Sequence, residues 1–212
     1  MLQTFNGIFN ADNVQKGLSL LRGKVGEKIA SEKLTLMDNP LMKESTSSCA
    51  FDAEGVATYK KNVIQNGVLN TFLHNIRTAT IEKIESTGNA SKSSYTALVE
   101  VAPSTLYVKS GKTSYEEMIK KLGNGLIITD MMGMHSGANP VSGDFSLASK
   151  GFLVQNGKIV RAVEQITVAG NYFELLKKIE FIGGDFKLGM PGGSSCFGSP
   201  SIIIKELSIA GE

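Results

Sequence analysis

The amino-acid sequence predicts an α+β fold with mainly antiparallel strands in a curved or barrel-like sheet, accompanied by short helices. Two observations lead to this class. Apolar segments are short and are interrupted by glycine and asparagine throughout, so few of them could form long helices. Two Asn-Gly pairs, Asn66-Gly67 and Asn156-Gly157, each lie between apolar runs, which is the pattern of antiparallel hairpins.

The elements before the first hairpin are a helix and a strand. Residues 13–22 are expected to be helical, because their apolar side chains recur at helical spacing and Asp12 or Asn13 can cap the first turn. Residues 33–37 are expected to form a strand that ends at a turn over residues 38–40.

The first hairpin is the clearest unit of the sequence. Residues 56–64 and 68–73 are its expected strands, and Asn66-Gly67 suits the positive backbone angles of a tight turn. A helix over residues 75–84 is expected next, and the loop of residues 86–89 ends it.

The second half begins with a helix signal. Ser114 with Glu117 three residues later is a capping box, which predicts a short helix from Ser114 to Leu122. Residues 126–131 are then expected to form a buried strand.

The second hairpin is expected over residues 151–168. A helix over residues 173–179 follows it, with Asn171 as its N-cap, and residues 202–209 are expected to form one last strand. The two hairpins share a pattern, since residues 63–69 and 153–159 are alike and each hairpin leads into a helix. An internal duplication that builds one curved sheet is one explanation, and the general preference of hairpins for Asn-Gly is the other.

Composition narrows the class of protein. The net charge of +2 argues against a dedicated nucleic-acid binder, which concentrates basic side chains on one face. No apolar run approaches the length that spans a bilayer, and the first residues contain no export signal. The two cysteines, Cys49 and Cys196, are therefore expected to be reduced thiols in the cytoplasm.

Self-contained zinc catalysis is not expected. The sequence has two histidines, His74 and His135, and neither is followed by glutamate. A helical zinc site needs two imidazoles about one turn apart with a carboxylate as base. The segment that ends at Gly111 lacks the first glycine of a phosphate-binding loop, and the glycine-rich segment 183–198 follows a helix, which does not fit a dinucleotide-binding motif. The segment that begins at Gly192 is not a nucleophile elbow, because Cys196 stands where the second glycine belongs. No catalytic residue is assigned.

Two segments resemble a known family. Residues 47–56, which include Phe51-Asp52-Ala53-Glu54-Gly55, and the loop of residues 86–90 form the first. The second runs from Gly137-Ala138-Asn139-Pro140 through Ser142-Gly143-Asp144-Phe145 to residues 166–171. In content, order and spacing they resemble the C-terminal half of TldD/PmbA proteins, and residues 1–212 are expected to be one such domain, without the family's N-terminal domain.

The resemblance implies a function. TldD-type subunits carry an H-E-x-x-x-H helix and a distal cysteine as zinc ligands, and the segment of residues 2–21 that corresponds here contains no histidine. The chain therefore resembles the non-catalytic PmbA or TldE branch. The expected partner is a TldD-like metallopeptidase subunit that holds the zinc, the expected substrates are unfolded peptides, and no cofactor is expected in this chain. The alternatives are a stand-alone metallopeptidase with an unrecognised site and a regulatory protein linked to DNA gyrase.

Few residues are candidates for the site. Cys196 lies near the position of the family's zinc-binding cysteine and is the one metal candidate, although packing is its preferred role. His135, Asn139 and Ser142 lie in the glycine-bounded signature segment and are candidates for contact with a substrate.

The first residues suggest self-association. Leu2, Phe5, Ile8 and Phe9 recur at helical spacing with few charges nearby, so they are expected to form an apolar contact with a partner or a second copy. The alternative is that they pack into the core of their own domain.

Overall fold

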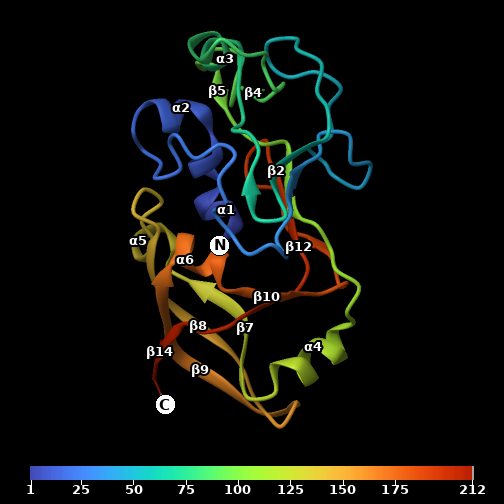
Figure 1. Cartoon of the computed structure of the whole chain (residues 1–212), viewed down its shortest axis with the longest axis vertical. Coiled ribbons are helices and arrows are strands. Elements are labelled where there is room, and N and C mark those ends of the chain that lie inside the picture. The colour runs from blue at the N-terminus through green and yellow to red at the C-terminus, as the bar shows by residue number, and fades with distance from the viewer. Residues whose placement is uncertain (212) are drawn as a thin grey trace.

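The structure is a computed structural model that describes residues 1–211. Its strands form four separate sheets, and no sheet closes on itself within the described residues. Figure 1 shows the largest hairpin in the lower half of the molecule and α3, β4 and β5 at the opposite end. The α+β class with mostly antiparallel strands is confirmed, and the curved or barrel-like single sheet is wrong, because the two hairpins belong to different sheets.

The first sheet has six strands in the order β11-β12-β6-β1-β2-β3. Its strands are β1 (Leu36–Asp38), β2 (Lys61–Gln65), β3 (Val68–Leu69), β6 (Thr105–Val108), β11 (Lys187–Leu188) and β12 (Cys196–Ser199). Only β12 and β6 run parallel among these pairs. In this sheet β12, which comes late in the chain, lies beside β6, and β6 in turn lies beside β1.

The second sheet has four antiparallel strands in the order β14-β9-β8-β7. They are β7 (Gly125–Met132), β8 (Asp144–Gln155), β9 (Lys158–Asn171) and β14 (Ser208–Ala210). Two small sheets complete the set, β4 (Ala90–Ser91) with β5 (Glu100–Val101), and β10 (Ile179–Ile182) with β13 (Ile202–Ile204).

The helices are short. They are α1 (Leu2–Phe5), the 3-10 helix η1 (Asn6–Phe9), α2 (Ala11–Gln15), α3 (Ile76–Glu82), α4 (Tyr115–Leu122), α5 (Met134–Gly137) and α6 (Tyr172–Lys177). Among the described residues, none of these helices has the length and apolar character needed to cross a membrane.

Both hairpin turns and two of the cap signals are confirmed, whereas the cap expected at Asp12 or Asn13 is wrong, because that helix begins at Ala11 and places both residues inside it. Asn66 and Asn156 adopt φ values of 49° and 51° and are each followed by a glycine with positive φ, so both hairpins turn where expected. The Ser114–Glu117 capping box forms in both directions at the start of α4. Asn171 caps α6 by accepting from the amides of Phe173 and Glu174.

Several expected boundaries are wrong. The helix over residues 13–22 ends at Gln15, because Gly17 adopts a φ of +76°. The first hairpin is shorter than expected, since β2 begins only at Lys61. The strand expected at 33–37 is shifted to Leu36–Asp38, which places Asp38 in the sheet instead of the turn.

Two strand predictions are also corrected. The strand at 126–131 exists as β7, but it is half-exposed because it lies at the edge of its sheet. The last strand, expected over residues 202–209, is two strands in different sheets, since the chain leaves β10 after β13 and joins β9 as β14.

The opening segment packs into the core. Phe5, Ile8 and Phe9 are buried, and the ring of Phe5 stacks on Tyr172 with centroids 4.3 Å apart. The expected contact of these side chains with a second copy is therefore wrong. Their apolar face is covered by the chain's own second sheet and α6, which is the alternative that the sequence left open.

Candidate functional site

A polar groove of about 700 Å³ lies beside the opening helices. Its lining comes from three parts of the chain that are distant in sequence: Gln3, Asn6 and Asn10 from the opening helices, residues 91–93 and 100–102 around β4 and β5, and residues 192–195 with Phe197 around the start of β12. We call this cavity the polar groove.

Three carboxamides form one side of the groove. Gln3 lies in α1, Asn6 begins η1 and Asn10 follows η1 directly, and the side chains of all three line the groove. Asn6 Nδ2 donates to the carbonyl of Gln3 at 2.5 Å. Asn10 Nδ2 donates to the carbonyl of Val101 at 2.8 Å, which ties the helical segment to β5.

The other two parts of the lining are joined to each other. The hydroxyls of Ser91 and Ser194 are hydrogen-bonded at 2.9 Å. Ser195 Oγ donates to the carbonyl of Pro103 at 2.6 Å, and Cys196 N donates to the carbonyl of Ser104 at 2.8 Å. The glycine-rich loop is therefore held against the chain that connects β5 to β6.

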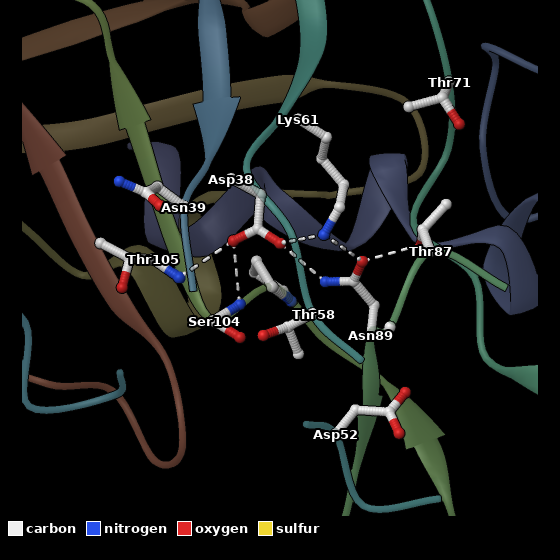
Figure 2. A network of polar contacts seen from close by, with 12 residues as sticks. Asp38, Asn39, Asp52, Thr58, Lys61, Thr71, Thr87, Asn89, Ser104 and Thr105 are labelled. Carbon is white, nitrogen blue, oxygen red and sulfur yellow. Dashed lines mark hydrogen bonds and ion pairs between the residues drawn. The ribbon is translucent and has the colours of Figure 1, made fainter. Parts of the chain in front are cut away.

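A buried ionic network supports this arrangement (Figure 2). Asp38 is fully buried, and its Oδ1 accepts from the amides of Ser104 and Thr105, both at 3.0 Å. Its Oδ2 accepts from Asn89 Nδ2 at 2.7 Å and from Lys61 Nζ at 3.4 Å. One carboxylate thus fixes both the chain before β6 and the chain before β4.

The ammonium group of Lys61 completes the network. Lys61 Nζ also donates to Asn89 Oδ1 at 3.1 Å, and Thr87 Oγ1 donates to the same oxygen at 2.7 Å. Burial lowers the pKa of Lys61, while the charge of Asp38 opposes that shift. Both charged groups are closed off from solvent, so their role is to position the strands and loops around the groove.

Asp52 holds the neighbouring loop. Its Oδ2 accepts from the amide of Ala90 at 2.9 Å, and its Oδ1 accepts from the amides of Glu54 and Val56. The segments that resemble the family at residues 47–56 and 86–90 are therefore in contact, and together they set the position of β4 at the groove.

Cys196 lies at the start of β12 among hydroxyl groups. Its sulfur is 3.3 Å from Thr46 Oγ1 and 3.3 Å from Ser47 Oγ. Burial raises the pKa of this thiol, but hydrogen bonds from Ser45, Ser47 and Thr46 outweigh that effect and lower the pKa to about 7. The thiol is buried, so this thiolate character is shielded from solvent.

The residues around Cys196 do not fit zinc. Zinc sites in proteins combine thiolate, imidazole and carboxylate ligands, whereas the neighbours of Cys196 are neutral hydroxyls. His74 is buried against Glu82, with 3.8 Å between Nε2 and Oε2, and His135 lies on α5. Within residues 1–211 no three histidine, cysteine, aspartate or glutamate side chains gather in a possible metal site.

The expected substrate-contact residues lie outside the polar groove. His135 is exposed on the short helix α5. Asn139 Oδ1 accepts from the amides of Val141 and Ser142, and Ser142 Oγ accepts from the amide of Asp144. These bonds shape the turn into β8. Contact of His135, Asn139 and Ser142 with a substrate stays a prediction.

Sequence reasoning missed the residues that build the groove. The sequence predicts Asp38 in a turn and Lys61 in a strand, and no pattern in it indicates a site role for Asn10. One signal was present, because Asn89 and Asp52 belong to the segments that carry the family resemblance. Their partners Asp38 and Lys61 lie at the end of β1 and the start of β2, where no local pattern indicates that the two side chains form a buried pair.

Comparisons with known proteins agree on a family. Residues 1–211 match the family model described as the PmbA/TldA metallopeptidase C-terminal domain. The chain is similar to a metalloprotease of Methanothermobacter thermautotrophicus, with 33% identity over 95% of this chain and 45% of that protein. It is also similar to the metalloprotease PmbA of Escherichia coli O157:H7, with 29% identity over 97% of this chain and 42% of that protein.

Solved structures give the same result. A Thermotoga maritima protein described as a candidate modulator of DNA gyrase is 41% identical, with a TM-score of 0.90 over 99% of this chain and 46% of that one. TldE of Thermococcus kodakarensis is 30% identical, with a TM-score of 0.87 over 96% of this chain and 46% of that one. The chain spans less than half the length of each of these relatives.

Proposed function

We propose, starting from the premise that this chain belongs to the PmbA/TldD metallopeptidase family, that it is a PmbA/TldE-type subunit that does not itself hold the catalytic zinc. Its partner in this proposal is a TldD-like subunit, which supplies the zinc and the hydrolysis of the peptide bond. The substrates are unfolded peptides, and the complex works in the cytoplasm.

The environment of Cys196 is the observation that carries the proposal. The thiol is the one metal candidate of the sequence, and Thr46 and Ser47 place neutral hydroxyls on its sulfur. A zinc-binding thiolate needs further nitrogen, sulfur or carboxylate ligands around the same ion. The similarity to TldE and PmbA supports the same branch, although TldD homologues of Buchnera aphidicola are also about 30% identical.

In this proposal the chain positions and encloses the substrate. The network around Asp38 fixes the strands and loops beside the polar groove and so holds the groove in shape. The pair of subunits would then share the tasks, with the catalytic ion in one subunit and a preformed polar surface in the other.

Zinc content and peptidase activity test the proposal. The purified chain should contain far less than one zinc per chain and should leave an unfolded casein peptide uncut. After mixing with a TldD-like subunit, the two should co-elute, and chelator-sensitive cleavage should appear. Cys196→Ser in this chain should leave the zinc content of the pair unchanged. One tightly held zinc in the isolated chain, lost in Cys196→Ser, would overturn the proposal.

A further inference from the structure

We infer that the polar groove binds the main chain of an extended, unfolded peptide and that Gln3, Asn6 and Asn10 are the side chains that pair with its amides. The inference rests on the proposed function, in which unfolded peptides are the substrates. It adds a binding site on this subunit and names the residues that form it.

The row of carboxamides matches the chemistry of a peptide backbone. Each carboxamide presents a carbonyl acceptor and an NH2 donor, the same pair of groups that every peptide unit presents. Gln3, Asn6 and Asn10 all line the groove, so this pair of groups recurs along one side of it. A ligand with regularly repeated amides can use all three.

Asn10 has an acceptor that the fold leaves unused. It stands at the N-cap position of α2, where an asparagine oxygen normally accepts from a helix amide, yet its side chain makes no cap hydrogen bond. Its NH2 group instead binds the carbonyl of Val101, and its Oδ1 has no partner among the described residues. The side chain is only 8% exposed, so an unpaired oxygen there costs stability that a ligand amide can recover.

The charge of the groove favours a neutral polar ligand. Its charged lining residues are Lys92 and Glu100, which have opposite signs, and the remaining lining is amide, hydroxyl, glycine or apolar. A nucleic acid or an acidic ligand would need several unpaired basic groups. Peptide amides carry no net charge and match this lining.

The two loops that carry lining residues also contain exposed apolar side chains. Tyr95 and Leu98 lie in the segment between the lining residues Ser93 and Glu100, and they are 93% and 86% exposed. Met190, two residues before the lining residue Gly192, is also 86% exposed. Exposed apolar groups in these two loops indicate a contact surface. An extended peptide presents amides to the groove and apolar side chains to these three residues, whereas a folded protein surface offers few free amides.

Binding of a fluorescent peptide tests the inference. The probe is an unstructured peptide of alternating leucine and serine, and its matched partner is the same peptide with N-methylated serine residues, which removes main-chain donors. Fluorescence anisotropy with the full chain should show binding of the first probe. Binding of the N-methylated probe should be weaker by about tenfold or more, because hydrogen bonds to the main chain are lost.

Variants locate the site. The double variant Gln3→Ala/Asn6→Ala changes side chains that are exposed or half-buried, and it should weaken binding by about tenfold or more. Asn10→Ser keeps a small polar group and should also weaken binding. Gln155→Ala, an exposed amide at the end of β8, is the matched control and should bind as the wild type does.

Each other outcome counts against the inference. Equal affinity for both probes, no binding at all, or unchanged binding by the double variant would overturn it. If the wild-type chain sediments as a dimer and the double variant sediments as a monomer, the groove binds a second copy of the chain. This result would also overturn the inference. Co-elution of the wild-type chain with a TldD-like subunit tests the proposed function, whereas loss of peptide binding by a double variant that still co-elutes tests the groove alone.

Discussion

The carboxylate of Asp38 and the ammonium group of Lys61 form an ion pair inside the six-stranded sheet, with 3.4 Å between Oδ2 and Nζ. The two side chains are 0% and 4% exposed. They come from the adjacent strands β1 and β2, and Asn89 bonds to both of them. A buried pair of this kind stabilises only while both partners are present.

Removal of one partner should therefore be costly. Lys61→Met leaves the Asp38 carboxylate buried without its cation and should lower the free energy of unfolding by about 3–5 kcal/mol. Urea denaturation measures the change. Lys150→Met removes the exposed pair with Asp130 and is the control, with an expected loss of less than about 1 kcal/mol. If the losses in free energy of unfolding caused by Asp38→Asn and Lys61→Met simply add in the double variant, the two side chains do not form the coupled pair described here.

Protonation of His74 should make stability depend on pH. Burial lowers the pKa of His74 below its ordinary value of 6.5, while the nearby Glu82 opposes the shift. The unfolded chain then binds the proton more readily than the folded chain. The contribution of neutral His74 to the free energy of unfolding is fully present above pH 6.5 and falls as the pH drops below 6.5. It levels off below the pKa of His74 in the folded chain.

Urea midpoints at neutral and mildly acidic pH test this prediction. His74→Gln should reduce the fall in stability between the two conditions, whereas His135→Gln, at an exposed position on α5, should leave the fall unchanged. An identical pH dependence in wild type and His74→Gln would contradict the assignment.

The hydroxyls around Cys196 should control its acidity. Burial raises the pKa of the thiol, but the hydrogen bonds from Ser45, Ser47 and Thr46 bring it to about 7. Thr46→Val removes one of these bonds with little change in shape, so the pKa of Cys196 should rise. Ultraviolet absorbance of the thiolate during a pH titration measures it, in a Cys49→Ser background that leaves one thiol. An unchanged titration in Thr46→Val would show that the hydroxyl does not stabilise the thiolate.

Phe5 should act as a core residue and not as a contact between copies. It stacks on Tyr172 and meets Phe145 edge to face, so Phe5→Ala should destabilise the chain by about 3–5 kcal/mol. Leu98→Ala, at an exposed position, should change stability by less than about 0.5 kcal/mol. Thermal or urea unfolding compares the two. A folded, stable Phe5→Ala chain with an altered oligomeric state would restore the contact predicted from the sequence.

The sequence by itself determined the local features of this protein. Both Asn-Gly turns, the Ser114 capping box and the Asn171 cap formed where the sequence placed them. Each of these depends on backbone angles or hydrogen bonds within about four residues, so the local residue types are sufficient. The family segments also follow from the sequence, because their order and spacing are visible in it.

Only the tertiary structure decided how distant segments meet. Asn10 bonds to a carbonyl 91 positions away, and Asn89 reaches Asp38 across 51 positions. Local pattern carries no information about such partners, so a polar residue in a strand could not be assigned to a network. The same reason explains the opening helix, whose apolar face fits either a partner or its own core. The ring of Tyr172, brought beside Phe5 by β9 and α6, made it part of the core.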